Sequence, residues 1–224
     1  LGLVLDGDAD RIAAVLPGGD FLSPQKILAL LALHLWKNRG IKGGIVKTIC
    51  GTAMIDNMAR ANGIPLYETP VGFKYISDLM LTKDIIAGGE EAGGMGLPNY
   101  IPERDGILAG LLLLEMMVYE KKNIGKILEE VEKKYGRYYY DKTSIQLKQT
   151  VKTLDPVKAL KEVLGKKVIG VKDYDGVKLD LEGDSWIMVR ASGTEPILRA
   201  YAESKSPKRT KELLNYALEL AKTL

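Results

Sequence analysis

Cysteine and histidine are almost absent from the chain, because Cys50 and His34 are the only examples among its 224 residues. A single cysteine excludes a disulfide within the chain and is typical of a reducing compartment, so we expect a cytoplasmic location. A single histidine within a predicted helix gives no basis for a Ser-His-Asp triad. We predict structural roles for both residues.

Long hydrophobic runs and a strong net charge are also missing. The longest apolar run, residues 27–33, is far too short to cross a bilayer, and no signal peptide is visible. The formal net charge is only +3. We therefore expect neither a nucleic acid nor a membrane surface as a partner.

The residues that are present are typical of a globular protein. Hydrophobic residues make up 46% of the chain and charged residues 27%, and the length suits one large domain or two ordinary ones. The chain starts inside an apolar run without an initiating methionine. We therefore expect it to be a fragment of a longer protein.

Strand-like and helix-like segments alternate up to about residue 136. Residues 1–5 are predicted to form a buried strand, and further strands are expected at 43–49, 64–68 and 85–87. The segments between and after them are predicted helices, which start at Ser23 and at residues 52, 73, 105 and 124. This alternation predicts an α/β domain in three layers around a mixed, largely parallel sheet.

The pattern changes after Gly136. Strands are predicted at residues 138–147, 167–171, 177–181, 186–190 and 197–202, with helices at 154–164 and 207–224. Clustered strands flanked by helices predict a second, smaller α+β domain.

Three aspartates alternate in the segment DGDADR, residues 6–11, directly after the first predicted strand. In an extended loop alternate side chains share one side, so Asp6, Asp8 and Asp10 are predicted to converge. Two carboxylates about 4 Å apart repel by roughly 4 kcal/mol at an effective dielectric of about 20, and a divalent cation removes that cost. Oxygen ligands favour Mg²⁺ or Ca²⁺. The sequence thus favours a metal site over a solvated turn.

Two other families place aspartates in similar loops. An EF-hand is excluded, because Arg11 and Pro17 stand where that loop requires Gly and Glu. A haloacid-dehalogenase-type phosphatase also has alternating aspartates after a strand, but it expects a small or hydroxyl residue in place of Asp10-Arg11.

A second polar loop, RASGTEP at residues 190–196, follows a predicted strand. The planar guanidinium of Arg190 suits a phosphate group, and the hydroxyls and the glycine let side chains and backbone N–H groups approach an anion. Arg199 could add a second cation. A third loop, at residues 88–94, carries Glu90 between glycines. The Glu90 carboxylate could accept hydrogen bonds from sugar hydroxyls, although a flexible turn without a binding role explains this loop equally well.

Together these loops resemble the α-D-phosphohexomutase superfamily, which includes phosphoglucomutases and phosphomannomutases. The segment at residues 6–11 resembles its Mg²⁺ loop, GEEAG at 89–93 its sugar-recognition loop, and RASGTEP at 190–196 its phosphate loop. TPVGFK at 69–74 and ERDG at 103–106 are supporting matches.

The resemblance implies a four-domain protein of which part is present here. Residues 1–20 resemble the tail of the second domain with the metal loop, residues 21–136 the third α/β domain, which recognises the sugar, and residues 137–224 the C-terminal α+β domain, which binds phosphate. The first domain carries the family's phosphoserine loop, with a pattern like TASHNP, which has no match here. We therefore expect the missing N-terminal domains of the same protein as partners.

The resemblance also implies roles for single residues. Asp6, Asp8 and Asp10 would hold Mg²⁺ against the phosphoserine. The implied catalytic residues are Arg11, Lys47 and Arg104. The implied substrate-binding residues are Gly72, Phe73, Lys74, Glu90, Ala92, Arg190, Ser192, Gly193, Thr194 and Arg199. Ala92 stands where the family usually has Ser, which removes a hydroxyl that could bond the sugar.

The activity implied is that of an isomerase. A phosphohexomutase interconverts hexose 1-phosphate and hexose 6-phosphate through a bisphosphate intermediate, and this chain would supply the metal, sugar and phosphate sites. We predict that the chain alone is inactive. Two alternatives remain open: a phosphosugar-binding module without activity, and a phosphatase that uses Asp6 as its nucleophile.

Overall fold

The computed structural model describes the chain except for residues 148–150, 152, 192–195 and 223–224. Backbone contacts divide it into two compact units, Leu1–Gly136 and Arg137–Leu224. Within the described residues, no helix is long and apolar enough to span a bilayer. The assignment of residues 1–20 to a separate preceding domain stays a prediction.

A four-stranded sheet forms the centre of the first unit. Its order is β5 (Leu66–Thr69), β4 (Gly44–Thr48), β6 (Ile85–Gly89) and β7 (Met95–Gly96). β4 runs parallel to β5 and β6, and only the short β7, which the sequence did not predict, is antiparallel. Every residue of β4 and β6 is buried, as expected for strands covered on both faces. The predicted largely parallel sheet is confirmed.

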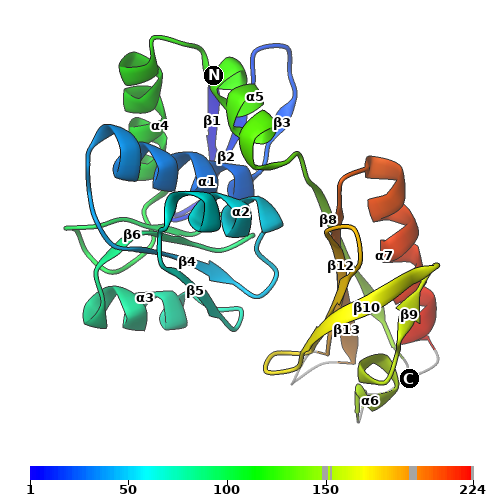
Figure 1. Ribbon diagram of the computed structural model, residues 1–224. Helices are drawn as coiled ribbons and strands as arrows, with labels where there is room; N and C mark the ends of the chain where they lie inside the picture. Colours follow the sequence, from blue (N-terminus) through cyan, green and yellow to red (C-terminus); the bar gives the residue numbers. More distant parts are fainter. Residues whose placement is uncertain (148–150, 152, 192–195, 223–224) are drawn as a thin grey trace. The chain divides into compact units, whose positions relative to one another are not determined.

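Helices cover both faces of this sheet. Figure 1 shows α1 (Pro24–Leu33) and α2 (Ala53–Asn62) on one face and α3 (Phe73–Thr82) on the other. The predicted caps hold: the Ser23 hydroxyl accepts from the Lys26 N–H at 3.5 Å at the start of α1. α2 starts at the side chain of Thr52 and ends at a left-handed Gly63. α1 continues as a π-helical turn, His34–Asn38.

A second, antiparallel sheet of three short strands carries residues 6–11, the acidic loop. Its order is β1 (Gly2–Leu5), β2 (Ile12–Val15) and β3 (Phe21–Leu22), and the helices α4 (Gly106–Glu120) and α5 (Ile124–Tyr135) complete the unit. The prediction that β1 is buried was wrong. Its apolar side chains are 39–50% exposed, because β1 is the edge strand and pairs only with β2.

The second unit is built on a six-stranded antiparallel sheet in the order β8-β13-β12-β11-β10-β9. α7 (Pro207–Ala221) packs on one face, where Val189, Leu198 and Leu213 form part of the apolar core. This arrangement confirms the predicted α+β class. The strands are β8 (Tyr139–Gln146), β9 (Glu162–Val163), β10 (Lys166–Lys172), β11 (Val177–Leu181), β12 (Ser185–Ala191) and β13 (Ile197–Ser204).

The predicted helix over residues 154–164 was wrong. Only α6 (Asp155–Lys158) is helical, and β9 follows it and pairs with β10. Leu164 and Gly165 both have positive φ, at 48° and 75°. Two consecutive residues with positive φ form the tight turn that joins antiparallel strands, so the Leu-Gly pair makes a hairpin in which residues 162–163 form a strand instead of continuing a helix.

Candidate active site

The three aspartates of the acidic loop converge on one point. One carboxylate oxygen from each of Asp6, Asp8 and Asp10 lies within 4.8 Å of the other two. The loop is a turn rather than the extended segment we predicted. The Ala9 N–H donates to the Asp6 carbonyl at 3.2 Å, and Ala9 adopts a left-handed φ of 59°. The turn therefore achieves the convergence that was predicted from simple alternation.

Two arginines partly neutralise this cluster. The Nε of Arg11 lies 2.5 Å from an oxygen of Asp6, and an Nη of Arg104 lies 2.8 Å from Asp10. Burial opposes ionisation of Asp6, but hydrogen bonds from the backbone and side chain of Arg11 outweigh it and lower the pKa of that carboxyl. Asp8 is exposed and forms no ion pair within the described residues.

The donor set fits a hard divalent cation. The cluster offers carboxylate oxygens only, which is the ligand type that Mg²⁺ prefers. In addition, the Oδ1 atom of Asp10 is buried and has no hydrogen-bond partner, with the Arg11 Nε at 3.5 Å. A buried carboxylate oxygen without a hydrogen bond is costly, and a bound cation would relieve that cost.

The loop at residues 88–94, called here the glycine-rich loop, is joined directly to the acidic loop. It turns tightly at its tip, where the Glu90 N–H donates to the Gly94 carbonyl at 3.0 Å and the Gly93 N–H donates to the Glu90 carbonyl at 3.1 Å. The Ile12 N–H donates to the Gly93 carbonyl at 3.0 Å, and Arg11 and Gly94 form an antiparallel bridge. Two of the three loops predicted from the sequence are thus hydrogen-bonded neighbours in one unit.

Glu90 lies in a mostly buried position, with only 8% of its surface exposed. Burial, followed by repulsion from Glu91, raises the pKa of the Glu90 carboxyl. The charges of Arg104 and Arg11 and a hydrogen bond from the Gly72 N–H act in the opposite direction. A desolvated carboxylate held among such donors is suited to accept hydrogen bonds from ligand hydroxyls.

Arg104 connects the loops of this site. Besides its ion pair with Asp10, its guanidinium carbon lies 5.7 Å from the ring centre of Phe73. A Cβ at Gly94 would lie 2.5 Å from the Cδ of Arg104 and 2.9 Å from a carboxylate oxygen of Glu90. No larger residue fits at Gly94 without displacing one of these two side chains, so the glycine is needed for close approach.

Lys47 lies on β4, beside Gly89 of β6 in the parallel register. Its side chain is only 2% exposed. Its ammonium group donates to Asp56 and to two backbone carbonyls at 3.4 Å, and it lies 3.8 Å from Glu68. The structure thus places Lys47 next to the start of the glycine-rich loop, with its charge already compensated by carboxylates.

The other predicted residues of the first unit occupy different environments. Gly72 precedes α3 with a φ of 132°, and Phe73 is 7% exposed beneath Arg104. Lys74 is exposed, with its ammonium 4.7 Å from the ring centre of Tyr75. Ala92 is exposed at the tip of the glycine-rich loop.

Sequence reasoning missed two supporting residues. The Thr48 hydroxyl donates to Glu91 at 3.2 Å, which ties the end of β4 to the glycine-rich loop. Asp175 lies 2.6 Å from the Nε of Arg190. Neither residue belongs to a recognisable motif, and only the pairing of distant segments reveals them.

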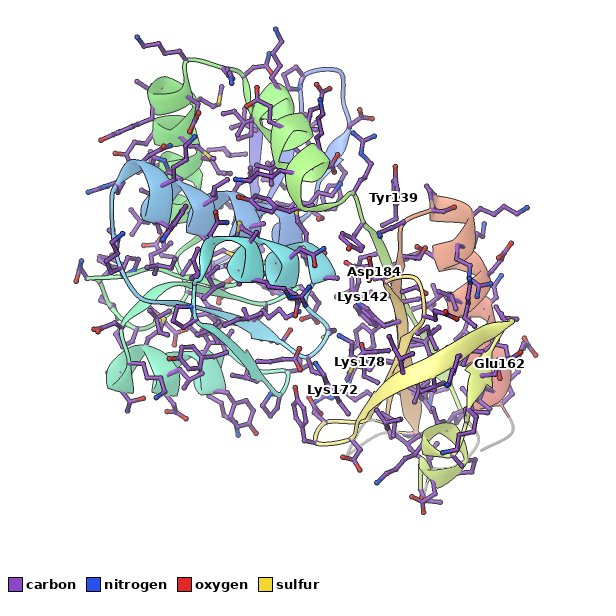
Figure 2. All side chains as sticks on the ribbon, in the orientation of Figure 1. Tyr139, Lys142, Glu162, Lys172, Lys178 and Asp184 are labelled. Carbon is purple, nitrogen blue, oxygen red and sulfur yellow. The ribbon has the colours of Figure 1, made fainter. Side chains whose placement is uncertain are left out.

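The second unit carries two arginines side by side. Arg190 on β12 and Arg199 on β13 are direct cross-strand partners. Figure 2 shows Lys142 and Lys178 on the face of the sheet turned away from α7, and the register places both arginines on that face. Like charges opposite each other are destabilising, and Asp175 offsets the charge of Arg190 from 2.6 Å away. The predicted phosphate-loop residues Ser192, Gly193 and Thr194 lie outside the described residues.

Comparison with known families agrees with this arrangement. The model described as phosphoglucomutase/phosphomannomutase, alpha/beta/alpha domain III, matches residues 23–135, and the model of the C-terminal domain of the same family matches residues 146–220. The chain belongs to the phosphoglucomutase/phosphomannomutase family. The resemblance stated from its motifs is confirmed.

Individual members of this family match along the whole chain. A phosphoglucomutase/phosphomannomutase of Thermococcus kodakarensis is 32% identical over 219 residues, which are 98% of this chain and 46% of the relative. A phosphoglucosamine mutase of Carboxydothermus hydrogenoformans is 32% identical over 227 residues, which are 100% of this chain and 47% of the relative. A crystal structure from Thermus thermophilus, assigned as a phosphomannomutase, has a TM-score of 0.83 and 38% identity, and the match covers 98% of this chain and 45% of that one. The chain therefore spans about half the length of these relatives.

The raised pKa of Glu90 predicts a pH-dependent effect on stability. The folded state binds this proton more tightly than the unfolded state, so the contribution is complete below the ordinary carboxyl value of 4.5 and is lost as the pH rises through the raised pKa. We expect the Tm of Glu90→Gln minus the Tm of wild type to become more positive from about pH 4 to about pH 7, because only wild type loses this contribution. Glu129→Gln, at an exposed helix position, is the matched control. A Glu90→Gln difference that stays constant or falls with pH would contradict this assignment.

Proposed function

We propose that this chain supplies the metal, sugar and non-reacting phosphate sites of a phosphohexomutase that interconverts hexose 1-phosphate and hexose 6-phosphate. Asp6, Asp8 and Asp10 would hold Mg²⁺, which when bound offsets negative charge on a transferring phosphoryl group. The serine that carries the phosphoryl group would come from the N-terminal half that the relatives possess.

The observation that carries this proposal is the direct pairing of two loops. The acidic loop and the glycine-rich loop share backbone hydrogen bonds, and Arg104 contacts both. A cation held by the aspartates would thus lie beside a carboxylate, Glu90, that can accept hydrogen bonds from sugar hydroxyls. A cation site next to a carboxylate that accepts hydrogen bonds from hydroxyls suits a phosphorylated sugar better than a phosphate ester that has no hydroxyls.

The chain's own residues would orient the substrate and stabilise its charge. Arg11 and Arg104 already pair with the acidic cluster and are placed to share their charge with a phosphoryl group when a cation takes over the aspartates. Arg190 and Arg199 would hold the phosphate that is not reacting. Lys47, with its charge committed to Asp56, is better placed to shape the site than to contact substrate.

The surface of the first unit supports an N-terminal half as partner. The edge strand β1 exposes Leu3, Val4 and Leu5 by 39–50%. On α4 the residues Ile107 and Val118 are 55% and 74% exposed. An apolar edge strand and an apolar helix face are typical of surfaces that another domain covers.

The isolated chain is expected to show no mutase turnover, because it would lack the phosphoryl-carrying serine. The assay is conversion of glucose 1-phosphate to glucose 6-phosphate by the purified chain with Mg²⁺. Measurable conversion by the chain alone would contradict the proposal. Phosphate release that Asp6→Asn abolishes would instead favour the phosphatase alternative.

A further inference from the structure

A pocket of about 280 Å³ opens at the end of the parallel sheet opposite to the candidate active site. Lys42 lies just before β4, and Asp84 lies just before β6, so the pocket is at the amino ends of these strands. The acidic and glycine-rich loops belong to the carboxyl ends. The pocket is therefore distinct from the site described above, and nothing in the proposed function uses it.

Two lysines at this pocket have uncompensated charges. The ammonium of Lys42 lies 6.0 Å from the ring centre of Trp36, and that of Lys83 lies 5.4 Å from the ring centre of Tyr67. Within the described residues, neither ammonium has a carboxylate partner, whereas Lys26, Lys37, Lys47 and Lys122 of the same unit each form an ion pair. A ring face attracts the ammonium but does not neutralise its charge as a carboxylate would, so the ammonium hydrogens can still donate to an anion.

The floor of the pocket is apolar and its rim is polar. Leu97 and Ile85 are 2% and 6% exposed, and Met80 lies beside them. At the rim, the ring of Tyr100 is half exposed, and the side chains of Asn99 and Asp84 are exposed. An exposed ring over an apolar floor suits a planar group, and an amide with a carboxylate suits hydroxyls.

We propose that this pocket binds a nucleoside monophosphate. The phosphate would lie between Lys42 and Lys83, the ribose hydroxyls would meet Asp84 and Asn99, and the base would pack on Tyr100 above the apolar floor. Asp84 is the one carboxylate among the residues that line the pocket, and it can accept hydrogen bonds from ribose hydroxyls, so inorganic phosphate alone would use only part of this arrangement.

The pocket shares packing with the candidate active site. The sulfur of Met80 lies 2.5 Å and a ring carbon of Phe73 lies 2.9 Å from the position that a Cβ would take at Gly96. Phe73 in turn lies beneath Arg104. Met80, which lines the pocket, and Phe73 therefore both pack against Gly96, and Phe73 in turn contacts Arg104, which pairs with Asp10 of the acidic loop.

Calorimetry of the whole chain with uridine monophosphate tests the proposal. We expect saturable binding that weakens about tenfold or more in the double variant Lys42→Gln/Lys83→Gln, because two charge-assisted hydrogen bonds are lost. Lys133→Gln, at an exposed position of α5, should bind as wild type does. Uridine without phosphate should bind more weakly than the monophosphate.

Two further measurements keep the outcome decisive. The amide signals of Leu97, Asn99 and Tyr100 should shift on titration, and the circular dichroism of the double variant should match wild type. Absence of binding at millimolar uridine monophosphate would overturn the proposal. Binding that the double variant or the loss of the phosphate leaves unchanged would overturn it equally.

Discussion

Replacement of Asp8 by asparagine is expected to weaken Mg²⁺ binding by about 10- to 100-fold, the range typical even for indirect partners of a metal site. Asp8 is the clearest test of the acidic cluster, because it is exposed and forms no ion pair within the described residues. Its loss therefore removes a ligand without releasing an arginine. Asp6→Asn or Asp10→Asn would also free Arg11 or Arg104, so their effects would combine two causes.

The matched control for this measurement is Asp20→Asn. Asp20 is an exposed aspartate in the neighbouring turn that joins β2 to β3. Calorimetric titration with Mg²⁺ should give wild-type affinity for this variant. An equal loss of affinity in both variants would show that overall charge, rather than the convergence of three carboxylates, governs binding.

Replacement of Arg190 by alanine is expected to weaken binding of glucose 6-phosphate to the chain by about 1.5–3 kcal/mol, or roughly 10- to 150-fold. A guanidinium can donate two parallel hydrogen bonds to a phosphate, and charge-assisted bonds of this kind are the strong ones. Arg190 is 25% exposed and already oriented by Asp175 at 2.6 Å. The guanidinium is therefore fixed before a ligand arrives, which lowers the entropic cost of binding.

Lys205→Ala is the control for Arg190→Ala. Lys205 is also a cation of the second unit, and it also pairs with a carboxylate at 2.6 Å, that of Asp184. It lies outside the β12–β13 loop, so its removal should leave the affinity for glucose 6-phosphate unchanged. Equal affinity of wild type and Arg190→Ala for glucose 6-phosphate would contradict a phosphate-binding role for the loop at residues 190–196. It would also contradict the alternative that the chain is a phosphosugar-binding module without activity.

Much of the fold could be predicted from local signals. α1 begins after Ser23, and α2 lies between Thr52 and Gly63, as capping preferences predict. The alternation of strands and helices predicted the parallel sheet. These signals are local, because a cap or a glycine with positive φ acts within a few residues of its own position. The convergence of the three aspartates could be predicted for a similar reason.

The remaining features depend on contacts between distant segments. The exposure of β1 follows from its place at the edge of a sheet, which an apolar run does not reveal. The contact between the acidic and glycine-rich loops joins Ile12 to Gly93, and no spacing rule predicts it. The same holds for Arg104, which the resemblance named but whose contacts with Asp10 and Phe73 only the structure shows.

The shape of the acidic loop illustrates the difference. Simple alternation predicted an extended segment, whereas the chain turns at Ala9 and is held by the Gly106 N–H, which donates to the Ala9 carbonyl at 3.1 Å. Gly106 starts α4, almost a hundred residues later in the chain. The prediction of the site was therefore right about convergence and wrong about the backbone that produces it.

Titration of the ¹⁵N-labelled chain with Mn²⁺, which occupies the same carboxylate sites as Mg²⁺, tests the central claim most directly. The paramagnetic ion should broaden the amide signals of Gly7 and Arg11 first, and then those of Gly93 and Gly94, which pair with this loop. Asp8→Asn should abolish the broadening at the same Mn²⁺ concentration. Broadening confined to other acidic positions, or broadening of Gly7 that leaves Gly93 and Gly94 sharp, would contradict a shared metal and sugar site.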